Sequence, residues 1–206
     1  MSAPDSSKVS NAKPKGEGGR YAGGLYFGDK GTAKIPTDAT TPLGDTLTSA
    51  GYLSDDGIKN KRARKTEDVV AFGGDTVLSV TTSLTETFEL GLLETTKDTL
   101  AIVYGDDNVT ESGDSITVKH NARDTPHKVY VFELAMTGNR VKRIVIPDGQ
   151  VSDVDDVAYK DGEAITYAPT ITAFPDDSGN TAYEYIAKVV QSAANPSGSD
   201  ADSQSK

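Results

Sequence analysis

Apolar and polar side chains alternate over a long stretch in the middle of the chain, between Gly73 and Gly105. From position 78 to position 92 the even positions are mostly apolar, with Glu86 as the one acid, whereas the odd positions carry mainly Ser, Thr and Glu. Successive side chains of a strand point to opposite faces, so this pattern predicts one long strand with an apolar face and a hydroxyl-and-acid face. Typical strands have about five or six residues, and this one is much longer.

A short helix is predicted directly after this strand. Thr95 or Thr96 can cap its first turn, and Asp98 places a carboxylate near the positive end of the helix dipole. Gly105 supplies the left-handed residue that commonly ends a helix. The strand and helix form a local unit that names no function.

Other alternating segments predict further strands. Leu25–Phe27 is expected to be a short edge strand. Residues 129–136 and 141–146 predict a hairpin around Thr137-Gly138-Asn139, and residues 147–149 are expected to end its second strand.

The second half of the chain repeats the long alternation. Residues 163–174 predict another long strand, in which Pro169 indicates an edge position or a bulge. Residues 181–190 predict a last strand, whereas Asp56-Gly57 predicts a tight turn between short extended pieces. The sum is a mainly β protein, a sandwich or barrel with one flanking α-helix and long extended loops and termini.

Composition limits the function classes. The 206 residues suit one medium domain, and a hydrophobic share of 35% with 20 glycines suits a β-rich chain that completes its buried surface by self-assembly. A net charge of −10 repels phosphate, which argues against tight nucleic-acid binding. The absence of cysteine excludes disulfides and thiol chemistry, and no apolar run is long enough to cross a membrane.

The two ends of the chain are polar. Residues 1–20 are expected to form a flexible arm that orders on contact with a neighbour, and residues 195–206 a disordered tail. The first residues lack the apolar core of a secretion signal. Residues 21–194 remain as the β domain.

Candidate chemistry is sparse. Four Asp-Asp pairs could in principle bind calcium, but they lack the alternate spacing, turn glycine and closing acid of calcium-binding loops. Acidic, soluble loops are therefore the favoured interpretation, and calcium binding stays open. His120 and His127 have no cysteine to complete a zinc set, and no serine lies in a Gly-x-Ser-x-Gly elbow. We therefore predict a non-enzyme without catalytic residues, metal or cofactor.

Residues 59–65, KNKRARK, form the one strongly basic run. Such runs occur in nuclear-localisation signals and nucleic-acid patches. Because acidic clusters are plentiful elsewhere in the chain, a solvated or ion-pairing loop is the favoured interpretation.

Several segments stand in a characteristic order: IPTDATTPLG at 35–44, GYLSDDGI at 51–58, Phe72-Gly73-Gly74, and the long strand with its helix. This series, within a similarity spanning about residues 21–190, resembles the major tail tube proteins of long-tailed (siphovirus) bacteriophages, in the version found in phages of actinobacteria. The resemblance implies a β-sandwich with a flanking helix, six copies closing into a ring, and rings stacking into the tube through which DNA leaves the capsid.

The resemblance also implies partners and a location. A tape-measure protein would fill the lumen, terminator and tail-tip proteins would bind the two ends, and DNA would pass without specific binding. The protein would be made in the host cytoplasm and reside in the virion tail. Some relatives append an immunoglobulin-like domain, which we do not expect after the tail at 195–206.

Within that resemblance, residues 55–74 would be a long loop that reaches the adjacent ring. The candidate inter-subunit residues are Asp55, Asp56, Lys59, Lys61, Arg62, Arg64, Lys65, Phe72 and Glu86. The hydroxyl-and-acid face supplies the candidate lumen-facing residues Ser79, Thr81, Ser83, Thr85, Thr87 and Glu89.

The alternative from another class is a β-sandwich binding module on the virion surface, with a host glycan or receptor as its ligand. Such modules usually present clustered exposed aromatic residues, and the absence of tryptophan counts against one here. Ring symmetry, the lumen-facing strand face, the host and tail contraction stay open from sequence alone.

Overall fold

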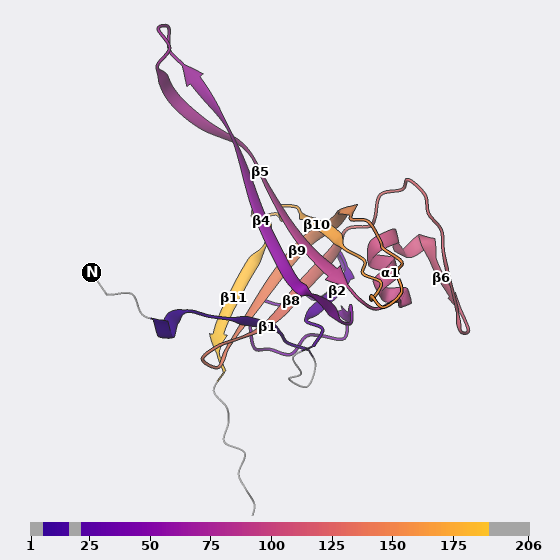
Figure 1. Ribbon diagram of the computed structural model, residues 1–206. Coiled ribbons are helices and arrows are strands. Elements are labelled where there is room, and N and C mark those ends of the chain that lie inside the picture. The colour runs from indigo at the N-terminus through magenta and orange to yellow at the C-terminus, as the bar shows by residue number, and fades with distance from the viewer. Residues whose placement is uncertain (1–5, 17–21, 190–206) are drawn as a thin grey trace, which may run out of the picture.

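The computed structural model describes residues 6–16 and 22–189 (Figure 1). Within these ranges the chain forms one nine-stranded sheet, a separate two-stranded sheet and one α-helix. Every strand pairing is antiparallel. The elements in chain order are β1 (Ala12–Pro14), β2 (Leu25–Asp29), β3 (Thr48–Ser49), β4 (Leu53–Val70), β5 (Thr76–Leu92), α1 (Lys97–Tyr104), β6 (Val109–Ser112), β7 (Ser115–Val118), β8 (Lys128–Met136), β9 (Arg140–Val154), β10 (Pro169–Ala173) and β11 (Tyr183–Lys188). The prediction of a mainly β fold with one helix is confirmed.

The large sheet has the order β3-β2-β8-β9-β10-β5-β4, with β1 added to β8 and β11 added to β9. β1 and β2 share one edge of β8, since Pro14 pairs with Leu134 and Leu25 pairs with Phe132. The expectation of a wholly flexible N-terminal arm is therefore wrong for residues 12–14, which form ladder bonds within the protomer. Residues 1–5, 17–21 and 190–206 lie outside the described residues, and with them the predicted C-terminal tail.

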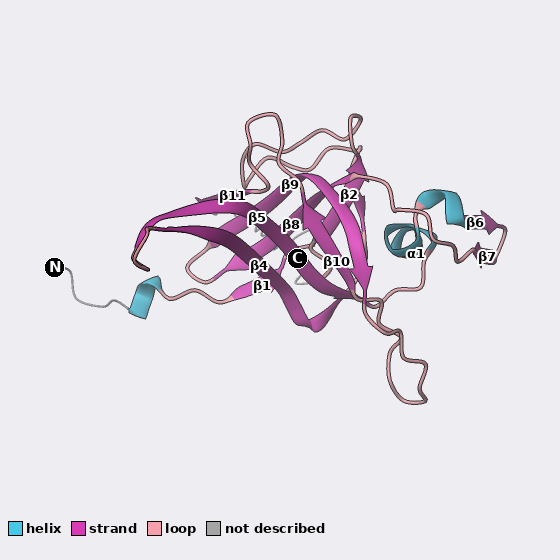
Figure 2. Cartoon of the chain, turned by 90° about the horizontal axis from the view of Figure 1, so that it is seen from above, coloured by secondary structure: helices cyan, strands magenta, loops and turns pink. Residues whose placement is uncertain are grey.

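The sheet curls, and its inner face forms the main core. Phe88 of β5 stacks on Phe132 of β8 with 5.6 Å between ring centroids, although β9 and β10 lie between these strands in the sheet. Buried residues of α1, including Leu100 and Ile102, join the same cluster. Figure 2 shows α1 with β6 and β7 beyond one end of the sheet.

The outer face of β8 and β9 is also buried. Val129, Val131 and Val145 pack with Leu47 and with the partly buried Leu43, so the irregular chain before β3 covers this face. Residues 35–43 contain no strand.

Thr96 is the N-cap of α1, because its hydroxyl accepts a hydrogen bond from the Thr99 amide at 3.2 Å. Thr95 instead lies 3.4 Å from the Tyr167 hydroxyl. Gly105 ends the helix with φ +87° and donates its N–H to the Ala101 carbonyl. The predicted helix is confirmed, with the choice of cap resolved.

Two predicted strand limits are wrong. β9 continues past residues 147–149 to Val154, because Pro147 and Asp148 form a bulge opposite Val129, where a proline needs no ladder bond. The long strand predicted at 163–174 is paired only at Pro169–Ala173, apart from a bridge between Tyr167 and Leu92. The register shift of this ladder lies between Thr170 and Ile171, where Ser152 of β9 is the unpaired residue, and Pro169 itself pairs with Val154. Pro169 is the first residue of a strand that lies between β9 and β5, so the predicted edge position or bulge at this proline is wrong.

The predicted turn at Asp56-Gly57 is also wrong, as is the predicted loop at 55–74. β4 is continuous to Val70, and its register jumps from Leu53–Leu92 to Ile58–Leu90. Four residues of β4 therefore face one residue of β5, and Gly57 takes φ +73° within this bulge. The pairing with β5 converts the expected loop into a strand.

Candidate functional site

The β4–β5 hairpin projects far beyond the rest of the protein (Figure 1). We call residues 59–85 the arm. Every side chain in the arm is exposed except Ala71, which is half-buried, whereas burial begins abruptly at Glu86. The same hairpin therefore has a base built into the core and an arm whose side chains remain exposed to water.

The tip of the arm is a turn between Ala71 and Asp75, closed by an Ala71 N–H bond to the Asp75 carbonyl at 2.8 Å. Phe72 on this turn is fully exposed. The other exposed large hydrophobic side chains of the arm are Val69, Val70, Val77, Leu78, Val80 and Leu84. Such a concentration of exposed apolar surface marks an interaction site.

The predicted inter-subunit cations line the part of β4 nearest the body. Lys59, Lys61, Arg62, Arg64 and Lys65 are all exposed, and residues 58–65 contain no acid. Outside the arm the chain carries 16 basic and 28 acidic side chains, so the body is negatively charged whereas residues 58–65 are positively charged. Asp55 and Asp56 lie exposed in the bulge at the base.

Glu86 lies where the arm enters the body and is 6% exposed. Its carboxylate accepts hydrogen bonds from Asn60 Nδ2 at 3.0 Å and from the Thr181 hydroxyl, and the Arg62 Nε lies 3.7 Å from its Oε1. An acid on the apolar face of the strand is thereby satisfied within one chain. Its predicted inter-subunit role stays a prediction.

The six candidate lumen-facing residues do not share one face. Lys65 pairs with Ser83, but its neighbour Thr66 pairs with Thr81, so Thr82 is an unpaired bulge residue. Paired residues lie on the same face, which places Ser79 and Thr81 opposite to Ser83, Thr85, Thr87 and Glu89. The single hydroxyl face predicted from alternation is wrong beyond Thr82, and no residue type in the sequence marks that bulge.

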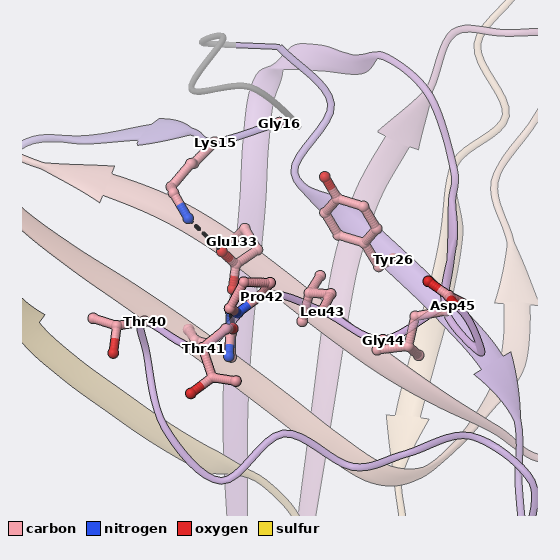
Figure 3. Close-up of a pocket in the computed structure, with 12 residues that line it drawn as sticks. Lys15, Gly16, Tyr26, Thr40, Thr41, Pro42, Leu43, Gly44, Asp45 and Glu133 are labelled. Atoms are coloured by element: carbon pink, nitrogen blue, oxygen red, sulfur yellow. Dashed lines mark hydrogen bonds and ion pairs between the residues drawn. The ribbon is translucent and has the colours of Figure 1, made fainter.

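A buried charge network that the sequence did not indicate ties the irregular segment to the sheet (Figure 3). Arg143 and Glu133 form a cross-strand pair between β8 and β9, with side chains 2% and 5% exposed. The Arg143 guanidinium also donates to the carbonyls of Asp38 at 2.6 Å and Thr41 at 2.9 Å. Glu133 further accepts from the Lys15 ammonium at 2.8 Å, which connects the N-terminal segment to the same network.

Figure 3 shows the pocket above this network, with a volume of about 400 Å³. It is open and lined by Tyr26 and Leu43 beside the charged pair. Asp38 lies at the start of the covering loop, and its carboxylate accepts hydrogen bonds from the amides of Thr40 and Thr41. These bonds, of which those from Thr41 have the largest effect, hold the pKa of the Asp38 carboxyl well below its usual range.

A second buried cation is Lys128, whose ammonium lies 2.8 Å from Asp29 Oδ1 and 2.7 Å from Asp106 Oδ2. Burial lowers the pKa of Lys128, but the bonds to Asp106 and Asp29 outweigh it, so the pKa lies above its ordinary value. Lys128 stays charged and joins β2, β8 and the end of α1. The alternation pattern gave no signal for it.

The two histidines have structural neighbours. His127 Nδ1 lies 2.5 Å from Asp148, which also bonds Lys30, and the His120 ring lies 4.6 Å from that of Tyr104. Among residues 6–16 and 22–189, no three His, Cys, Asp or Glu side chains are grouped to hold a metal ion. In the same ranges, no helix has the length and apolarity to cross a membrane.

A family model described as phage tail tube protein matches residues 21–197, which is most of the chain. A comparison with curated proteins yields no match. The tail tube is a structural, non-enzymatic part of the virion, and a projecting arm with an apolar tip and a basic flank suits a chain that assembles with copies of itself. By this match the chain belongs to the phage tail tube protein family.

Proposed function

We propose that the chain closes into six-membered rings that stack into the tail tube, and that the arm is the contact between copies. One observation carries this proposal: residues 59–85 are exposed in the protomer although they include seven large hydrophobic side chains. Monomeric proteins rarely maintain such a surface. A second copy that covers it removes the cost of exposure.

Charge supports the same arrangement. The cations from Lys59 to Lys65 have one partner within the described chain, Glu86, which the guanidinium of Arg62 approaches. The body of a second copy offers an excess of carboxylates to the others. Such complementarity selects the orientation of the arm and speeds association.

For the lumen we propose the face that carries Ser83, Thr85, Thr87 and Glu89. These β5 side chains are hydroxyls and one acid, but their β4 partners on the same face include Lys59, Lys61 and Lys65. DNA can slide past this wall only if carboxylates of a second copy neutralise the three lysines, which is the contact proposed above for the arm. Ser79 and Thr81 leave the lumen-facing set because of the bulge at Thr82.

The type of phage is proposed from the sequence segments at 35–44 and 51–58. We infer from them a long-tailed phage of the actinobacteriophage type. A tape-measure protein in the lumen, with terminator and tail-tip proteins at the ends, completes the proposed assembly.

The test is negative-stain electron microscopy of the purified chain over a range of concentrations. Rings and tubes are expected, and a protein that stays monomeric at every concentration would refute the proposal. The double variant Lys61→Glu with Lys65→Glu should shorten tubes while the melting temperature of the monomer is unchanged, because both side chains are exposed. Lys119→Glu with Lys188→Glu makes the same charge change outside the arm and should leave tubes intact. Arg62 is a poorer choice because it approaches buried Glu86.

A further inference from the structure

The bulge at Thr82 exchanges the two faces of the arm. We call the face that bears Phe88 and Leu90 the core face, and the face that bears Thr87 and Glu89 the opposite face. From Ile58–Leu90 at the base outward to Lys65–Ser83, the side chains of both strands alternate regularly between these faces. The next residue of β5 toward the tip, Thr82, has no partner, so the alternation of β5 shifts by one residue there. The Thr82 hydroxyl donates to the Lys65 carbonyl at 3.3 Å and closes the bulge.

The composition of each face changes at this point. On the body side of Thr82 the opposite face is polar, with the pairs Lys59–Glu89, Lys61–Thr87, Ala63–Thr85 and Lys65–Ser83. Beyond Thr82 the same face carries the pairs Glu67–Val80 and Val69–Leu78. The core face makes the reverse change, from Ile58–Leu90 and Asn60–Phe88 at the base to Thr66–Thr81 and Asp68–Ser79 in the outer part.

We infer that the outer arm is buried against a second copy of this chain through its opposite face, and that Val69, Leu78 and Val80 form the contact. These three side chains are 45–54% exposed in the protomer, while the core face of the same segment carries the polar pairs Thr66–Thr81 and Asp68–Ser79, with Val70 as its one large apolar side chain, next to the tip. The base of the hairpin buries one face in its own body, and the outer part buries the other face in its neighbour.

The occupant is a second copy for two reasons. The chain belongs to a family that self-assembles in the tail, and the cations beside this strip complement a body that carries 28 acids against 16 bases outside the arm. Glu67 at the edge of the strip is the one acid in these outer pairs on the opposite face. The inference rests on the proposed tube assembly and adds which face of the arm makes the contact.

Two variants remove the bulge with opposite consequences for the faces. Deleting Thr82 makes Ser83 and Thr81 neighbours in sequence and keeps the pairs Lys65–Ser83 and Thr66–Thr81, so the apolar strip stays on the opposite face. Inserting one threonine between Lys65 and Thr66 gives Thr82 a partner instead. That insertion transfers Val69, Leu78 and Val80 to the core face.

The experiment measures the critical concentration for tube formation by sedimentation and electron microscopy, with circular dichroism of the monomer as the folding control. The deletion should assemble within about threefold of the wild type, whereas the insertion should raise the critical concentration at least about tenfold, equivalent to about 1.4 kcal/mol. Equal assembly of both variants, or equal loss in both, would overturn the face assignment. If the wild type forms no tubes, the proposed function itself fails, which is a distinguishable result.

Discussion

Replacing Arg143 by methionine tests whether the buried network holds the covering segment on the sheet. The variant keeps a long apolar stem and removes the guanidinium, which bonds Glu133 and the carbonyls of Asp38 and Thr41. Removing one partner of a buried ion pair costs about 3–5 kcal/mol, because the other charge is left buried. Lys15 remains 2.8 Å from Glu133 and offsets part of that loss. We therefore expect about 3 kcal/mol, a large fraction of the stability of a domain.

The assay is urea unfolding at a concentration where the protein is monomeric by ultracentrifugation. A double-mutant cycle with Glu133→Gln separates the pair from the carbonyl contacts, and a coupling of about 2 kcal/mol is expected for side chains in direct contact. The reasoning would be refuted by a loss below about 1 kcal/mol in the single variant. It would equally be refuted by additive effects of the two substitutions.

Three further predictions follow from the fold. Phe88→Ala should cost about 3–5 kcal/mol in urea unfolding because Phe88 is 1% exposed, and the matched Phe72→Ala at the exposed tip should cost below about 0.5 kcal/mol. Burial raises the pKa of Asp148, but hydrogen bonds from Lys30 and His127 outweigh it, so the folded pKa lies below 3.8. The carboxylate therefore stabilises the fold above pH 3.8, and this stabilisation is lost as pH falls through the folded pKa. Asp148→Asn should lose stability at neutral pH, with a deficit that shrinks below pH 3.8, measured by urea unfolding across pH. Arm amides should exchange hydrogen rapidly in the monomer and slowly in tubes, since an isolated two-stranded hairpin is marginal in water; equal protection in both states would contradict an inter-subunit arm.

The sequence predicted those parts of the fold that depend on one strand or one helix end. Alternation located β5 and β8, and the residue types at Thr96 and Gly105 marked the two ends of α1. These signals are local, because a strand shows its period and a helix shows its caps within a few residues.

Bulges and buried charge pairs could not be predicted from such local signals. The bulge at Thr82 depends on how many residues β4 supplies opposite it, and the same holds for Pro147 and Asp148 in β9. Glu133 and Arg143 become partners only through the β8–β9 register, so neither residue alone indicates a buried ion pair. In both cases the information lies in the pairing of two segments.

The location of the bulges has a consequence for how the protomer divides its stability. From Glu86 inward, β5 packs on the core and on β10, so the base of the hairpin is held by buried side chains. Outward from Leu84, the strands have only each other, and the side chains that could bury apolar area face water. A contact that covers the outer strip therefore adds hydrophobic stabilisation that the protomer lacks. The core of the protomer does not depend on this part of the hairpin, so opening the outer arm costs the body little stability. Changes in the outer arm should accordingly alter assembly while the body keeps its structure.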